Sequence, residues 1–216
     1  MLLTPEPDLS LIKGVVFDLD GTLFDSRESN IAFYNYLLGF VGLPRTAEQA
    51  VEVIHRESME GSLRFLMGEG AEFKAAMEHW KTMDTGQFID QLRLFPHVRE
   101  TLNQLKLHFE LAVCTNRTKT TMRSLKRFDL EGYFSQVVTP LDAGASKPAP
   151  LLMELVLKGL GLSANEVIFV GDSQLDQALC QTCRVNFVAY DNLELEAWAH
   201  FNDYKKLPAL LGLGEK

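Results

Sequence analysis

The sequence predicts an α/β protein with a doubly wound parallel sheet. From residue 94 onward, short apolar runs alternate with stretches long enough for one helix each. This alternation is typical of parallel sheets with helices on both faces. The apolar run at 15–17 is followed at once by acidic residues, which suits a strand that is buried on both faces and ends at a polar site.

The first predicted strand, 15–17, ends at Asp18 and Asp20. Residues two apart on an extended chain point the same way, so both carboxylates are expected beyond the C-terminal end of the strand. Gly21 lets the chain turn there. Two acids placed together repel each other and lose hydration unless a cation lies between them or one carries a proton. The pair therefore indicates a site, although solvated turn residues remain an alternative.

Residues 25–94 are predicted to form an all-helical insert, because no run of β-branched residues occurs there. Its helices are expected at 28–38, 47–57, 62–67 and 71–83, separated by glycine and proline breaks. About seventy residues is far above the usual loop length, so the insert is predicted to be a small domain. The predicted division is then a core of residues 1–24 and 95–216 and a helical domain of 25–94.

The second half supplies the rest of the predicted sheet. Strands are expected at 111–114, 137–138, 167–170 and 185–190, and helices at 97–109, 118–127, 151–159 and 175–182. The segment after residue 192 is expected to pack back on the core. In such sheets ligands bind beyond the C-terminal ends of the strands. The polar residues expected at those ends are Asp18, Asp20, Thr115, Asn116, Lys147, Asp172 and Asp176.

Composition narrows the function classes. The formal net charge of -8 argues against general binding to nucleic acid or to anionic membranes. No run is long enough to cross a bilayer, and residues 1–14 do not resemble a signal peptide. Cys180 and Cys183 have CxxC spacing, but no second pair completes a zinc site. A cytoplasmic monomer or homodimer is expected.

The predicted polar residues can support phosphoryl transfer. Asp18, Asp20 and Asp172 supply oxygen ligands for a hard cation, and so small a set with room for water and phosphate suits Mg²⁺. Lys147 offers a point charge to a phosphate, and Thr115 with the N–H groups after it can cradle an anion. Each also has a structural alternative, such as a loop lysine or a helix cap. Phosphoryl transfer depends mainly on positioning and charge stabilisation.

Four motifs resemble those of the haloacid dehalogenase-like phosphohydrolases, closest to the phosphoglycolate phosphatase branch. They lie at 17–26, 113–116, 146–150 and 170–176 and span most of the chain. The resemblance implies that Asp18 is the nucleophile and a metal ligand. It implies that Asp20 is the general acid/base, with its carbonyl on the metal, and that Asp172 is a further ligand. The resemblance also implies that Asp176 and Ser173 support the metal ligands from behind. It implies that Thr115, Asn116 and Lys147 hold the transferring phosphate.

The insert lies where this family carries its cap. Residues 60–62, with Gly61 at the centre, resemble the cap loop that enters the cleft. The candidates to meet a remote anionic group of the substrate are Arg117, His55, Arg56 and Arg64.

The resemblance implies a Mg²⁺-dependent phosphatase. Its partner would be a small phosphorylated metabolite, such as phosphoglycolate, and the reaction would pass through an aspartyl-phosphate. Asp20 disfavours a dehalogenase, because the dehalogenases of this superfamily lack that second aspartate. A sugar-phosphate mutase, a phosphonate hydrolase and a non-catalytic phosphate-binding protein remain open.

Overall fold

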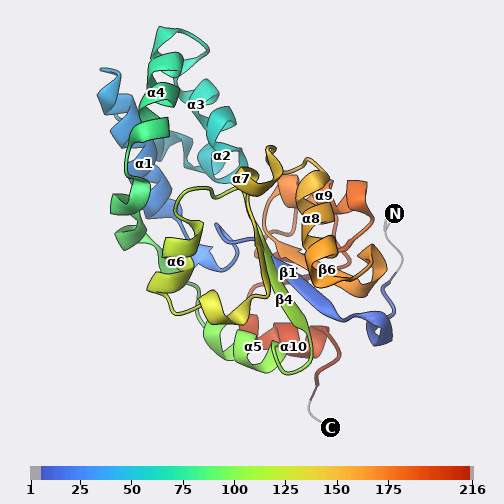
Figure 1. The fold of residues 1–216 in the computed structure, drawn as a ribbon. Coiled ribbons are helices and arrows are strands. Elements are labelled where there is room, and N and C mark those ends of the chain that lie inside the picture. Colours follow the sequence, from blue (N-terminus) through green and yellow to red (C-terminus); the bar gives the residue numbers. More distant parts are fainter. Residues whose placement is uncertain (1–5, 215–216) are drawn as a thin grey trace.

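The computed structural model describes residues 6–214, apart from the side chains of residues 55 and 56, and its centre is a six-stranded sheet (Figure 1). The strand order is β5-β4-β1-β6-β7-β8, and every neighbouring pair is parallel. The strands are β1 (Gly14–Phe17), β4 (Glu110–Cys114), β5 (Gln136–Val138), β6 (Val167–Gly171), β7 (Asn186–Tyr190) and β8 (Ala199–Phe201). The predicted α/β class with a doubly wound parallel sheet is confirmed.

Helices cover both faces of this sheet (Figure 1). Those on the two faces are α5 (Val98–Leu105), α6 (Thr121–Arg127) and α10 (Leu207–Leu210), and then α8 (Leu151–Leu160) and α9 (Gln174–Cys183). Successive residues of β1 alternate between the two cores, because side chains of a strand point to opposite faces. Val15 and Phe17 join the first core and Val16 joins the second, all of them fully buried.

The insert consists of helices that stand together away from the sheet (Figure 1). Its α-helices are α1 (Arg27–Phe40), α2 (Val51–Arg56), α3 (Met59–Met67) and α4 (Ala71–Thr82), with 3-10 turns at Ala47–Ala50 and Thr85–Gln91. They have an apolar cluster of their own, which includes Leu37, Ile54 and Leu63. The short strands β2 (Phe24–Asp25) and β3 (Arg93–Leu94) pair antiparallel where the chain enters and leaves the insert. The two-domain division itself stays a prediction.

Several element boundaries differ from those predicted. The helix expected at 97–109 is α5, Val98–Leu105: His97 has φ 65°, outside the helical region, and the chain must turn before Glu110 donates to the Lys13 carbonyl. The loop after β5 contains a short helix, α7 (Pro140–Ala143), capped by Thr139. Strand β8 was not predicted, because three residues carry too little periodicity to mark a strand. Within the described residues, no helix is both long and apolar enough to cross a membrane.

The C-terminal segment packs on the core, as expected. Phe201, Tyr204 and Leu207 belong to the same apolar cluster as Phe17 of β1. The Tyr204 hydroxyl donates to the backbone carbonyl of Thr22, at 2.8 Å, and the Tyr204 carbonyl accepts from Thr101 Oγ1, at 2.9 Å. Tyr204 is fully buried, and its hydrogen bond to Thr22 fixes the turn that follows β1.

We expect Tyr204→Phe to lower the free energy of unfolding by about 1–2 kcal/mol, because the Thr22 carbonyl loses a buried donor. Tyr133→Phe is the matched control, since the Tyr133 hydroxyl donates to Asn103 at an exposed position. Its effect should stay within about 0.5 kcal/mol. Urea denaturation followed by fluorescence measures both, and equal losses would contradict a special role for Tyr204.

Candidate active site

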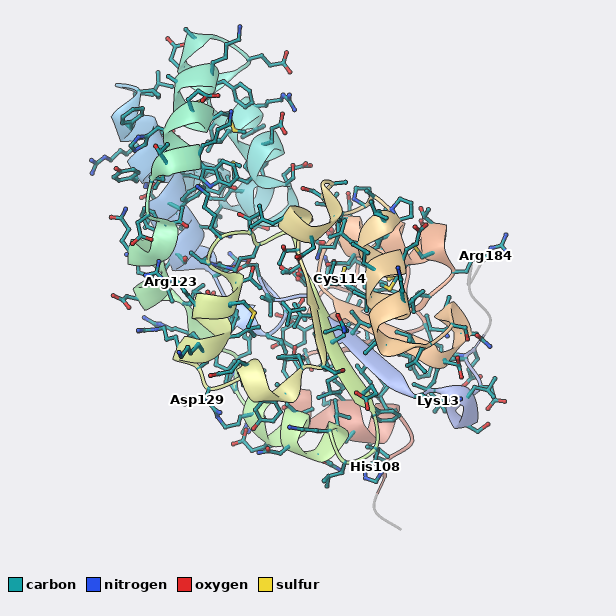
Figure 2. The ribbon with its side chains drawn as sticks, in the orientation of Figure 1. Lys13, His108, Cys114, Arg123, Asp129 and Arg184 are labelled. Atoms are coloured by element: carbon teal, nitrogen blue, oxygen red, sulfur yellow. The ribbon has the colours of Figure 1, made fainter. Side chains whose placement is uncertain are left out.

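The predicted polar residues meet at the C-terminal edge of the sheet. Asp18 follows β1, Thr115 follows β4 and Asp172 follows β6. Cys114, the last residue of β4, marks this edge in Figure 2. A cavity of about 140 Å³ opens here between the sheet and the insert. The predicted residues that line it are Asp18, Asp20, Thr115, Asn116, Arg117, Lys147 and Ser173.

Lys147 is the central cation of the site. Its ammonium lies 2.8 Å from Asp18 Oδ1 and 2.6 Å from Asp176 Oδ1, and all three side chains are buried. Burial alone would lower the pKa of Lys147, but the carboxylates of Asp176 and Asp18 outweigh burial and raise it above its usual value. The ammonium therefore stays charged and compensates part of the negative charge.

Three carboxylates lie close together at this site. Asp18, Asp172 and Asp176 each offer an oxygen, and these atoms lie within 4.8 Å of one another. Burial raises the pKa of Asp18 to about 6, and Lys147 limits the rise. Burial, followed by Asp176 and Asp18, raises the pKa of Asp172. If ionised, three carboxylates and one ammonium leave two negative charges. That deficit and the oxygen donors fit a divalent hard cation such as Mg²⁺.

Asp172 is held by one hydrogen bond to its carboxylate and one to its backbone carbonyl. Thr22 Oγ1 donates to Asp172 Oδ1 at 2.7 Å, and Asn192 Nδ2 donates to the Asp172 carbonyl at 2.9 Å. Gly21 has φ +77°, and a Cβ on it would lie 2.2 Å from Asp172 Oδ2. Only glycine lets the turn after β1 approach this carboxylate so closely.

Asp176 is fixed through the start of α9. Ser173 caps this helix: its N–H and hydroxyl donate to Asp176 Oδ2 at 3.1 and 2.6 Å. A Cβ on Gly171 would lie 2.6 Å from the Asp176 carboxyl carbon, so the close approach requires glycine. Because Lys147 takes the other oxygen, both oxygens of Asp176 are engaged within the protein.

Arg117 pairs with the second aspartate of the first motif. Its Nε donates to Asp20 Oδ2 at 2.9 Å and a terminal nitrogen donates to Asp20 Oδ1 at 2.6 Å. This two-pronged contact is the geometry that guanidinium and carboxylate groups favour. Asn116 holds the Lys147 loop instead, because its Oδ1 accepts from the Lys147 N–H at 2.7 Å.

The loop expected at residues 60–62 is part of a helix in the structure. Residues 60–62 lie in the first turn of α3, which Ser58 caps by accepting from the Gly61 N–H at 3.1 Å. Ser58 before an apolar stretch is a helix-start signal, which places the start of the helix at Met59 instead of residue 62. Gly61 is absent from the cavity lining. Arg64 is half exposed and pairs with Glu60 and Glu69.

Two predicted residues cannot be placed in the site, and two residues that were not predicted belong to it. The side chains of His55 and Arg56 lie outside the described part of the chain, so their predicted role has no structural counterpart here. Thr22 and Asn192 orient Asp172 but were not predicted as site residues. Thr22 offers a local signal, since a hydroxyl follows Asp20 and Gly21 directly. Asn192 offers none, because its contact depends on the path of the chain after β7.

The chain has relatives of known class. A family model described as haloacid dehalogenase-like hydrolase matches residues 15–190. A phosphoglycolate phosphatase of Yersinia pestis is 31% identical over 182 residues, which cover 76% of this chain and 75% of that protein. One of Pectobacterium atrosepticum is 33% identical over 192 residues, 82% of this chain and 80% of that protein.

Solved structures give the same result. The crystal structure of a HAD-superfamily hydrolase, subfamily IA, from Geobacter sulfurreducens superposes with a TM-score of 0.81 at 31% identity. The superposition covers 92% of this chain and 99% of that one.

We expect Gly21→Ala to destabilise the protein more than Gly42→Ala. Gly42 has φ +76°, nearly the same as Gly21, but nothing lies within 4 Å of a Cβ placed on it. Both variants pay for a left-handed alanine, about 1–2 kcal/mol. Gly21→Ala must also displace the carboxylate of Asp172, which adds about 1–3 kcal/mol. Equal free energies of unfolding in urea would show that Asp172 yields without cost.

Asp172→Asn and Asp176→Asn should change stability in opposite directions when divalent cations are absent. Asparagine at 172 removes repulsion and can still accept from Thr22, so the free energy of unfolding should rise by about 1–2 kcal/mol. At 176 it leaves Lys147 with one fewer buried carboxylate, so the free energy should fall.

The pH dependence of the Asp172 effect follows from its raised pKa. The penalty from a carboxyl whose pKa is higher in the folded chain is present above that folded pKa. The penalty disappears as the pH falls toward the unfolded pKa. The gain of Asp172→Asn should therefore shrink as the solution is acidified. Urea denaturation in EDTA over a pH series measures it, and a destabilised Asp172→Asn protein would contradict the repulsion.

Proposed function

The chain belongs to the haloacid dehalogenase-like hydrolases and is a phosphohydrolase, and from this premise we propose that it is a Mg²⁺-dependent phosphatase of a small phosphate monoester. The observation that carries the proposal is the buried Asp18, which faces the cavity beside an ammonium and two further acids. A carboxylate can approach an anionic phosphate only where positive charge surrounds both.

Asp18 acts first. One of its oxygens bonds to phosphorus, the ester P–O bond breaks, and Asp20 gives a proton to the departing alkoxide. In the second step Asp20 takes a proton from water, the water oxygen bonds to phosphorus, and the bond between Asp18 and phosphorus breaks. These steps release the alcohol and then phosphate and restore both carboxyl groups.

The other predicted residues hold the phosphoryl group. Lys147 places its charge beside Asp18, Asn116 fixes the loop that carries Lys147, and Thr115 lies buried at the cavity wall. Mg²⁺, when bound, neutralises the carboxylates and a phosphoryl oxygen. Asp18 and Asp172 would hold it, together with the Asp20 carbonyl. Asp176 would support them from behind, because its oxygens already bind Lys147 and Ser173.

Arg117 adds a condition to the first step. Its two hydrogen bonds hold both oxygens of the Asp20 carboxylate, and the carboxylate is the form that accepts a proton from water. To protonate the alkoxide, Asp20 must carry a proton, and the two Arg117 nitrogens that bound Asp20 can then donate to the phosphoryl oxygens. We propose that Arg117 moves from Asp20 to the phosphoryl oxygens, whereas the sequence suggested it for a remote anionic group of the substrate.

The proposals for location, oligomeric state and partners rest on the sequence alone. We propose that the protein acts in the cytoplasm as a monomer or homodimer, on a small phosphorylated metabolite and without binding nucleic acid. The net charge of -8 supports the last point.

We expect Asp18→Asn to abolish phosphate release from small esters, by about 10³-fold or more, because the amide cannot form the covalent intermediate. Asp90→Asn is the control, since Asp90 is exposed and forms an ion pair with the surface residue Arg127. Wild-type turnover should vanish in EDTA and return with Mg²⁺. The assay monitors free phosphate in a panel of esters. Residual turnover in Asp18→Asn, or transfer within the substrate without phosphate release, would contradict the proposal.

A further inference from the structure

We propose that the alcohol released from the substrate is uncharged and largely apolar and carries a flat ring. The inference rests on the proposed phosphatase function and names the substrate class of that same cavity. It departs from phosphoglycolate, whose leaving group bears a carboxylate. The observations that carry it are the residues that the insert contributes to the cavity and the charges around them.

The insert gives the cavity an apolar wall. Among the lining residues that the insert contributes, six are apolar or aromatic: Phe33, Tyr34, Ile54, Met59, Trp80 and Phe88. They come from α1, α2, α3, α4 and the turn before β3. The other lining residues of the insert are Ser29, Asn30, Glu57 and Thr85. The leaving group points away from the phosphoryl site at the sheet edge, so this wall is what it meets. Burying an apolar group against such a wall is favourable, whereas burying an unpaired charge there is not.

The aromatic part of this wall is built before any ligand binds. Phe33 packs edge-on against Tyr34 and against Phe88, with centroids 5.0 and 5.6 Å apart. Lys119, from the segment after β4, lies over Trp80, with its ammonium 4.7 Å from the ring centroid. Lys119 also donates to the carbonyls of Trp80 and Lys81. Rings held in this way lose little freedom when a further ring packs against them.

Charge in the cavity disfavours an anionic leaving group. The cations in its described lining are Arg117 and Lys147. Lys147 already compensates two carboxylates, and Arg117 pairs with Asp20. Both lie on the sheet side, where the phosphoryl group needs them. Among the side chains that the structure describes, the charged residue that the insert places in the lining is Glu57, an acid. It would repel a carboxylate on the substrate.

The test compares benzyl phosphate with 2-phosphoglycolate in the presence of Mg²⁺. Both leaving groups are primary alcohols, so intrinsic reactivity does not favour either strongly. We expect kcat/KM to be about tenfold higher or more for benzyl phosphate. Glu57→Gln should raise kcat/KM for phosphoglycolate relative to kcat/KM for benzyl phosphate. Trp80→Leu should lower kcat/KM for benzyl phosphate much more than for phosphoglycolate.

Trp198→Leu is the control for the loss of a tryptophan, because Trp198 packs on the sheet core outside the cavity. It should preserve the preference for benzyl phosphate. A higher kcat/KM for phosphoglycolate, in a reaction that still requires Asp18, would overturn the inference and leave the phosphatase proposal standing. Absence of turnover for every ester in the panel would overturn both.

Discussion

The ammonium of Lys147, held between Asp18 and Asp176, is the interaction on which the site depends. The three charged side chains come from the end of β1, from the loop after β5 and from α9, so the site forms only when the parallel sheet has aligned its C-terminal ends. Removing one member of a buried ion pair leaves an uncompensated charge, which is costly. Together with Asp172 this cluster keeps an excess of negative charge, which favours the binding of a cation.

Hydrogen bonds from the packed core position the carboxylates of the site. Tyr204 holds the carbonyl of Thr22, and the hydroxyl of Thr22 holds Asp172. This chain of contacts joins the C-terminal segment to the turn after β1 and then to β6. Close backbone approach at Gly21 and Gly171 leaves these carboxylates little room to move. The ligands are therefore positioned by packing before any cation arrives, which favours binding because little order remains to be imposed.

Local pattern was enough to predict the strands that end at the site. Apolar runs followed by Asp18, Thr115 and Asp172 predicted the strand ends, because the C-terminal ends of parallel strands share one edge. The pairing of Arg117 with Asp20, 97 positions apart, could not be predicted, because it depends on side-chain geometry between segments distant in sequence. Gly61 was placed in a loop, although Ser58 starts a helix that contains it. The Ser58 cap outweighs the preference of a glycine for a loop.

The pairing of β2 with β3 makes the insert exchangeable. Phe24 lies opposite Leu94 and Asp25 opposite Arg93, so the chain departs from the sheet and comes back at adjacent positions. Any segment whose ends can meet at that spacing fits the same gap without altering strand order. Sequence changes can therefore replace the insert, and with it the wall that faces the alcohol, without disturbing the phosphoryl site at the sheet edge. Substrate range and chemistry can then evolve separately.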